Sequence, residues 1–324
     1  MRPLKLVPDN TNIPFLSYRW WAMGLSIILI IASLVLCFVR GLNLGVDFVG
    51  GQMVRVALER PVEIESLRSD IEKLNLGDAT IQQFGSPRDI SIRMPVPKGG
   101  EEAANQAAMA VKQVVLKSYP AARFDAVETV SGKVSDELFR TGMMALGLAM
   151  LGISLYIWFS FEWQFGVGAL FALFHDVVIT FGFFALTQLE FNLNVVAALL
   201  TIIGYSLNDT IVVYDRVREN LRKFRKMEII PLLDLTVNET LSRTMMTSLS
   251  LFVALGILLF LGPDVIFGFT AAMLLGIVVG TFSSAYVAAP ILVWLKVGPD
   301  SFLPAGETRA SVSKGDAERI TPRD

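Results

Sequence analysis

The sequence has very few residues that bind metals or form disulfides. Its 324 residues include one cysteine, Cys37, and one histidine, His175, so an internal disulfide is impossible and a transition-metal site is not expected. Charged residues make up only 18% of the chain, and the net charge of −2 gives no sign of affinity for nucleic acid. The composition therefore predicts no metal, no cofactor and no nucleic-acid partner.

Long apolar runs are abundant. Hydrophobic residues make up 53% of the chain, which is typical of polytopic membrane proteins. A bilayer crossing takes roughly 20 residues, and six segments approach or exceed that length: 20–39, 139–159, 165–187, 193–214, 244–261 and 266–295. The first run leads into CFVRGLNLG instead of a small-residue cleavage site, so we interpret it as a retained span and not as a signal peptide.

Basic residues predict how the spans are oriented. Loops rich in Lys and Arg stay in the cytoplasm, and basic clusters precede the first span and follow the fourth: Arg2, Lys5 and Arg19, then Arg216, Arg218, Arg222, Lys223, Arg225 and Lys226. Both termini are then cytoplasmic and residues 40–138 are exported. Residues 1–19 form a cytoplasmic segment, 215–243 a cytoplasmic amphipathic loop, and 296–324 a cytoplasmic tail expected to be disordered.

The exported stretch has the pattern of a small α+β domain. Alternating and helical periodicities follow one another in the order β-α-β-β-α-β, over 52–60, 62–75, a hairpin around Ser86 and Pro87, 101–119 and 122–130. This order matches the ferredoxin-like motif. The predicted fold is therefore an α-helical polytopic membrane protein with six transmembrane helices and an exported ferredoxin-like domain between helices 1 and 2. No catalytic cluster stands out in that domain, so we expect a binding or mechanical role and no enzyme.

Asp209 is the residue most out of place, because it lies inside the fourth apolar segment, six residues before the charged boundary at Asp215. A charged side chain within a span costs roughly 2.5–3.5 kcal/mol on insertion scales, and such residues mark ion pathways. Asn194, Thr201 and Asn208 repeat every seven residues, and a helix–helix interface explains them. It explains Asp209 less well, so we interpret Asp209 as a proton-coupling site, with Asn208 beside it.

Arg243, at the start of the fifth span, is the candidate partner of Asp209. Arg243 and Thr247, like Thr244 and Ser248, are spaced i, i+4 and give this helix a polar face. Burial and a nearby guanidinium act in opposite directions on a carboxyl's affinity for a proton. A movement of Arg243 relative to Asp209 would therefore bind or release one. The alternative is that Arg243 only extends to the cytoplasmic headgroups.

His175 and Asp176 in the third span are secondary candidates. Gly168, Ala172, Asp176 and Thr180 recur every four residues, which places Asp176 on a small-residue face and away from lipid. A proton relay and a structural hydrogen bond to a neighbouring helix both fit this position.

Glycines elsewhere indicate packing and turns. The sixth span has a small residue at every fourth position, which favours close helix crossings, at Gly268, Ala272, Gly276, Gly280, Ser284 and Ala288. Gly50 and Gly51 follow Asp47 but lack the Lys and the helix of a phosphate loop, so they predict a tight turn into the exported domain.

Four motifs and the predicted topology carry a family resemblance. The motifs are GLNLGVDFVGG (41–51), FEWQFGVGALFALFHDVVITFGFF (161–184), IGYSLNDTIVVYDRVREN (203–220) and NETLSRTMMTSLS (238–250). With the topology they cover nearly all of 20–295, and they resemble the SecD/SecF family of the resistance-nodulation-division superfamily. That family often has a basic residue before FEW, where this chain has Ser160, and the loss of one charge puts nothing central in doubt.

The resemblance implies a subunit of the SecD–SecF accessory complex of the Sec translocase. Such a subunit pairs with a SecD chain of similar topology beside the SecYEG channel, with YajC and YidC as further partners, in the bacterial inner membrane. The complex uses the proton motive force to promote export of translocating polypeptide. On this view Asp209 matches the family's proton-path aspartate and Arg243 its partner on the next span.

Three other functions remain open at this point. One is a proton-coupled half-transporter of the same superfamily for small molecules, whose exported domain is usually larger. Another is an intramembrane serine protease, since Gly204, Tyr205 and Ser206 resemble a GxS turn and His175 is an available base, but Asn208 replaces the second glycine of that motif. The third is a purely structural subunit, for which Asp209→Asn would leave function intact.

Overall fold

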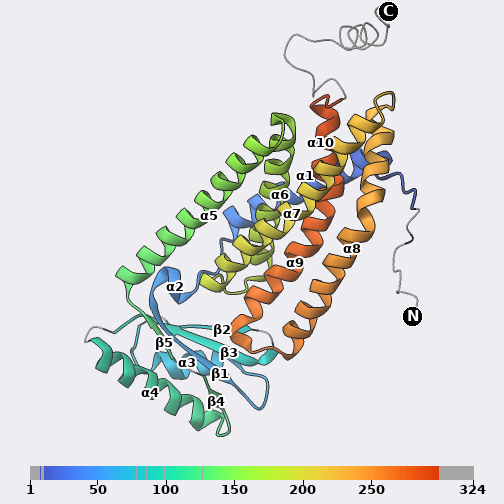
Figure 1. Cartoon of the computed structure of the whole chain (residues 1–324). Coiled ribbons are helices and arrows are strands. Elements are labelled where there is room, and N and C mark those ends of the chain that lie inside the picture. Colours follow the sequence, from blue (N-terminus) through green and yellow to red (C-terminus); the bar gives the residue numbers. More distant parts are fainter. Residues whose placement is uncertain are drawn as a thin grey trace, which may run out of the picture.

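Six long helices form a bundle beside a small α+β domain in the computed structural model, which describes residues 8, 11–77, 79–84, 86–97, 100–125 and 127–298 (Figure 1). All six are long and apolar enough to cross a membrane. They are α1 (Arg19–Val39), α5 (Gly132–Ser160), α6 (Trp163–Thr187), α7 (Leu193–Lys223), α8 (Ile229–Leu261), and a last span made of α9 (Phe267–Ser283), η3 (Ser284–Ala288) and α10 (Ala289–Trp294). The chain is a multi-pass membrane protein, as predicted.

The centre of the bundle consists of α6, α7 and α9. Their most apolar stretches are 67%, 56% and 50% buried, against 22%, 17% and 11% for α1, α5 and α8. Close packing of α7 on α9 uses the predicted small-residue ridge. A methyl group at Gly276 would collide with Ile202, and one at Gly280 would come within 3.1 Å of Ser206. The predicted packing role of these glycines is confirmed.

The sequence predicts a single span over 266–295, but the structure interrupts the α-helix within it. A π-helical turn, Ser284–Ala288, separates α9 from α10. Pro290 stands at the start of α10, and because proline has no backbone N–H it cannot donate to the carbonyl one turn earlier. The carbonyl of Ala288, at the end of the π-helical turn, accepts a hydrogen bond of 3.0 Å from the hydroxyl of Tyr214 on α7. Such wide turns are frequent at functional sites.

Residues 215–243, expected to be a loop, are mostly helical. α7 extends to Lys223 and α8 begins at Ile229, so only a short connection joins them. The two helix ends hold each other by polar contacts that the pattern of residues along the chain could not indicate. Asn220 Nδ2 donates to Thr236 Oγ1 at 3.0 Å and to Glu239 Oε2 at 2.7 Å. The amphipathic segment therefore extends α8 as part of the bundle.

The domain between α1 and α5 is ferredoxin-like, as predicted. Its sheet has the order β2-β3-β1-β4, with β5 also paired to β1, and every pair is antiparallel. The predicted last strand is split in two. The elements are α2 (Val46–Val49), β1 (Gly51–Ala57), α3 (Ile64–Glu72), β2 (Thr80–Phe84), β3 (Ser86–Met94), α4 (Gly100–Ser118), β4 (Arg123–Phe124) and β5 (Glu128–Val130).

The two faces of this sheet have different partners. Val54, Val56, Ile90 and Ile92 form an apolar core with α3 and α4, as the alternation of strand side chains requires. The opposite face is polar and turns toward the helix bundle (Figure 1). There Arg93 Nη1 on β3 donates to the carbonyl of Leu44 at 2.5 Å. On β1, Arg55 pairs with Glu128 at 2.9 Å and approaches Glu190, between α6 and α7, at 3.9 Å.

The segment that enters the domain is bonded to the start of α7. Asp47 Oδ2 accepts a hydrogen bond of 2.9 Å from the backbone N–H of Leu193, the first residue of α7. Gly50 and Gly51 then turn the chain into β1 with φ of +74° and +128°, a region that side chains disfavour. A Cβ at Gly51 would lie 2.8 Å from the carbonyl of Met94. The predicted entry turn is confirmed.

Candidate functional site

Asp209 is buried in the bundle, where it is 3% exposed. It lies on α7, an uninterrupted helix of 31 residues whose first turn is capped by the side chain of Asn192. No described residue is a hydrogen-bond partner of its Oδ2. An unpaired buried carboxyl oxygen is costly and calls for an explanation, of which a functional role is one.

Arg243 on α8 is close enough to act on Asp209 electrostatically, but no salt bridge joins the two in the described part of the chain. Arg243 is exposed, whereas the next residue, Thr244, is buried and faces Asp209. The Thr244 hydroxyl has no partner with hydrogen-bond geometry among the described residues. The structure therefore places Asp209, Arg243 and Thr244 in one neighbourhood with their polar atoms unpaired.

Asn208 points to a different side of α7 from Asp209. It is exposed and belongs to a stripe of exposed small and polar residues along one face of the helix: Asn194, Ala197, Thr201, Gly204 and Asn208. We call this set the α7 stripe. A Cβ added at Gly204 would meet nothing within 4 Å. Polar groups facing lipid are unfavourable, so the stripe has the character of a surface that another helix covers.

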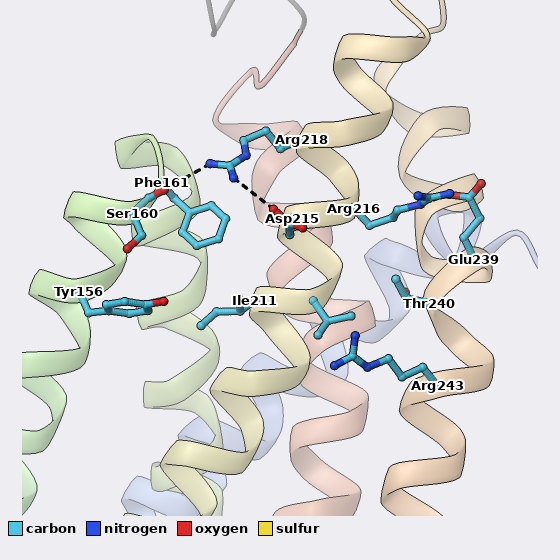
Figure 2. Close-up of a pocket in the computed structure, with 11 residues that line it drawn as sticks. Tyr156, Ser160, Phe161, Ile211, Asp215, Arg216, Arg218, Glu239, Thr240 and Arg243 are labelled. Atoms are coloured by element: carbon cyan, nitrogen blue, oxygen red, sulfur yellow. Dashed lines mark hydrogen bonds and ion pairs between the residues drawn. The ribbon is translucent and has the colours of Figure 1, made fainter.

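A cavity of about 560 Å³ opens at the end of α7 that carries the basic cluster. Figure 2 shows Tyr156 and Ser160 on one wall, from α5, and Thr240 and Arg243 on the opposite wall, from α8. Ile211 of α7 lies between the walls. Arg243 therefore lines an open space next to the buried region that holds Asp209. On α7, Asp209 precedes Ile211 by two residues, which is less than one turn of helix.

Ion pairs surround the mouth of this cavity. Arg218 donates to Asp215 at 3.1 Å and to the carbonyl of Ser160 at 3.3 Å. Arg216 bonds Glu239 on α8 at 2.7 Å. The i, i+3 spacing of Asp215 and Arg218 was a signal in the sequence, whereas Glu239 carried none, because its partner lies on another helix. Arg243 is thus an arginine of this cavity that lacks a salt bridge within the described chain.

His175 and Asp176 belong to a separate buried cluster, away from lipid as predicted. His175 Nδ1 lies 2.9 Å from Asp176 Oδ1. Asp176 Oδ2 accepts hydrogen bonds from Ser206 Oγ at 2.5 Å and Ser283 Oγ at 2.9 Å. The cluster joins α6, α7 and α9. Neither Ser206 nor Ser283 is recognisable from the sequence as part of it, because a serine in an apolar helix usually bonds its own backbone.

This cluster does not have the geometry of a serine protease. Ser206 donates to the carboxylate of Asp176, and His175 Nε2 has no hydrogen-bond partner in the described chain. A hydrolytic triad requires the base to accept the proton of the serine hydroxyl. The described residues also include no group of three or more His, Cys, Asp and Glu that could hold a metal ion.

Fold and site together define a class of protein. Six membrane-crossing helices, a buried carboxyl at their centre and a ferredoxin-like domain between the first two are the architecture of a multi-pass membrane transport component. Two family models match the sequence: "Protein export membrane protein SecD/SecF, C-terminal" over residues 98–298, and "SecD/SecF GG Motif" over 35–62. The chain belongs to the SecD/SecF family of protein export membrane proteins.

Similar proteins support this assignment. A protein translocase subunit SecF of Cereibacter sphaeroides is 42% identical over 319 residues, covering 95% of this chain and 98% of its own. Another from Desulfurispirillum indicum is 44% identical and covers 87% and 91%. The crystal structure of SecDF, a translocon-associated membrane protein from Thermus thermophilus, superposes with a TM-score of 0.82 at 34% identity. The match covers 90% of this chain but only 40% of that one.

A second solved SecDF structure, in a super-membrane-facing form, superposes less closely. Its TM-score is 0.63 at 31% identity, over 98% of this chain and 41% of that chain. The chain thus spans about two fifths of the solved SecDF chains and nearly the whole length of the curated relatives.

Proposed function

We propose that this chain is the SecF-type subunit of a SecD–SecF unit that uses the proton motive force to promote preprotein export across the bacterial inner membrane. Asp209 carries the proposal: a buried carboxyl within a span, with an unpaired oxygen and with Arg243 in electrostatic reach but not bonded to it. A carboxyl that is held unpaired is available to take up and release a proton. The family assignment supports protein export as the work that this proton drives.

In the proposed cycle, Asp209 is neutral when protonated and charged when the proton leaves. Arg243 approaches the charged form and withdraws from the neutral form, so a shift of α8 against α7 accompanies each transfer. The energies are of the right order, because one charge crossing 100 mV releases about 2.3 kcal/mol and a tenfold change in proton affinity takes about 1.4 kcal/mol. The cavity beside Arg243 gives that side chain open space in which to move relative to Asp209.

A SecD chain is the proposed partner. The solved SecDF chains are more than twice as long as the region that this chain matches, which leaves room for a second half of similar size. We place SecD against the α7 stripe, whose exposed small and polar residues suit a helix–helix interface better than lipid. The unit works beside the SecYEG channel on translocating polypeptide, with YajC and YidC as further partners, and both termini lie in the cytoplasm.

The test compares Asp209→Asn with a matched control on the same helix, Asp215→Asn. Asp215 is exposed and bonded to Arg218, so its loss removes a charge outside the buried site. Each variant is co-expressed with SecD, and export of a model preprotein is measured in membrane vesicles with and without a proton gradient. We expect Asp209→Asn to assemble normally and lose only the gradient-dependent part of export, while Asp215→Asn keeps it.

Normal gradient-dependent export by Asp209→Asn would make Asp209 structural and remove the proposed coupling. Equal loss in both variants would mean that charge at this end of α7 matters and that the buried position does not.

A further inference from the structure

We infer that Asp176 is a positioning residue for Asp209, a hydrogen-bonding hub that fixes α7 between α6 and α9. The inference rests on the proposed proton role of Asp209 and concerns what holds that residue in place. Asp176 is 1% exposed, and Ser206 and Ser283 are no more exposed than that. The cluster therefore lies wholly inside the bundle, where every hydrogen bond is protected from competition by water.

The carboxyl of Asp176 has side-chain partners on both of its oxygens. Ser206 and Ser283 both donate to Oδ2, and His175 Nδ1 lies at hydrogen-bond distance from Oδ1. His175 is the titratable group facing Asp176 from α6, while α7 and α9 contribute the two serine hydroxyls. Asp176 is therefore a fixed acceptor, in contrast to Asp209 with its unpaired oxygen.

A second set of hydroxyls holds α7 from the other side at the same level. Tyr205 OH lies 2.8 Å from Ser248 Oγ of α8, which in turn lies 2.7 Å from Thr281 Oγ1 of α9. Consecutive residues of α7, Tyr205 and Ser206, thus bond α8 and α6 directly, and each of their partners in turn bonds α9. Hydrogen bonds therefore hold α7 to its neighbours at one level. The π-helical turn of the last span begins directly after Ser283.

The hydrogen bonds of Tyr205 and Ser206 lie just before Asp209 in the sequence. Ser206 precedes Asp209 by three residues, which is about 4.5 Å along the axis of a helix that rises 1.5 Å per residue. The helix is unbroken between them, so a rotation at Ser206 turns Asp209 with it. Gly280 adds to the constraint because its missing side chain brings α9 against Ser206. The orientation of Asp209 toward Arg243 and Thr244 on α8 thus depends on the hub.

A hydrophobic carbodiimide tests the inference, since it modifies buried carboxyls in their protonated form. The SecD–SecF unit in liposomes is treated across a pH series, and peptide mass spectrometry reads modification at Asp209 and Asp176 separately. We expect modification of Asp209 with a defined pH midpoint. Ser206→Ala and Ser283→Ala should each shift the Asp209 midpoint by about half a pH unit or more, a change that corresponds to a several-fold change in proton affinity.

Thr180→Val is the matched control, because Thr180 is a buried hydroxyl on α6 that donates to the backbone carbonyl of Asp176 and not to its carboxylate. It should leave the Asp209 midpoint unchanged. The inference is overturned if neither serine variant moves the midpoint or if only one does. A failed proposed function is distinguishable, since Asp209 would then show no pH-dependent modification and Asp209→Asn would export normally.

Discussion

Two buried carboxyls of this bundle differ in how their oxygens are used. Asp176 has acceptor bonds on both oxygens, from three side chains on three helices. Asp209, one turn past Ser206, has an oxygen with no partner among the described residues. The bonds of Asp176 hold neighbouring helices together, whereas the unpaired oxygen of Asp209 leaves that carboxyl available for the proposed proton transfer. Both residues are aspartates, and only the side chains that surround them differ.

The close contact of one glycine with a neighbouring helix leads to a prediction about the stability of the protein. Gly182 of α6 lies against α1, where an added Cβ would come within 2.7 Å of the Cα of Ser33. Gly182→Ala should therefore push α1 away and destabilise the protein by about 1–3 kcal/mol, the usual cost of overpacking. Thermal unfolding in detergent measures it.

Gly152→Ala on α5 is the control for Gly182→Ala. A Cβ at Gly152 would meet nothing within 4 Å, so this variant should be as stable as wild type or slightly more stable, because alanine favours helix. Equal melting temperatures for the two variants would show that α1 moves aside without lowering the stability of the protein.

At the scale of elements, the contact between the sheet and the α6–α7 connection contributes to the stability of the fold in a pH-dependent way. Burial raises the pKa of Glu190, and the nearby Arg55 opposes the rise. A raised pKa in the folded state means that Glu190 stabilises the fold below its unfolded pKa of about 4.3. That contribution is lost as the pH rises through the folded pKa.

Glu190→Gln removes this titration and keeps the shape of the side chain. We expect its stability relative to wild type to increase steadily as the pH is raised from about 4.3 to neutral. Thermal unfolding of both proteins over that range tests this, with Glu65→Gln on the exposed face of α3 as the control. A stability difference that stays constant with pH would contradict the predicted role of Glu190.

Helix lengths and interruptions were the least predictable features at this scale. α8 begins at Ile229 and not near Thr244, because Asn220 and Glu239 pair the ends of α7 and α8. The π-helical turn in the last span is followed by Pro290, and its last carbonyl accepts a hydrogen bond from Tyr214 of another helix. Apolar runs mark where a helix enters lipid, but they do not mark where it ends in water.

At the scale of the whole molecule, the α7 stripe and the open cavity beside Arg243 lie on one side of the bundle. We expect SecD to cover the stripe. A photoreactive benzoylphenylalanine in place of Thr201 should therefore cross-link to a co-expressed SecD chain. The same replacement at Ile28 should not, since Ile28 is exposed on α1, which packs on α6. Cross-links from Ile28 alone would place the partner on the opposite side of the bundle.

Several conclusions followed from the sequence by itself. Six apolar runs determined six membrane-crossing helices, and the alternation of apolar residues determined the ferredoxin-like order, because hydrophobicity and periodicity are properties of neighbours along the chain. Asp209 could be singled out because a carboxyl is costly in any apolar helix, whatever surrounds it. Gly50 and Gly51 indicated a turn for a similarly local reason.

Which polar groups meet was decided only by the tertiary structure. Asp176 bonds Ser206 and Ser283, and the latter lies 107 residues away along the chain. Arg243 remains without a salt bridge to Asp209, while Asn208 faces outward on the α7 stripe. A hydrogen bond depends on distances of about 3 Å between specific atoms. Those distances are set by how the helices pack against one another, and a one-dimensional pattern of residue types does not contain them.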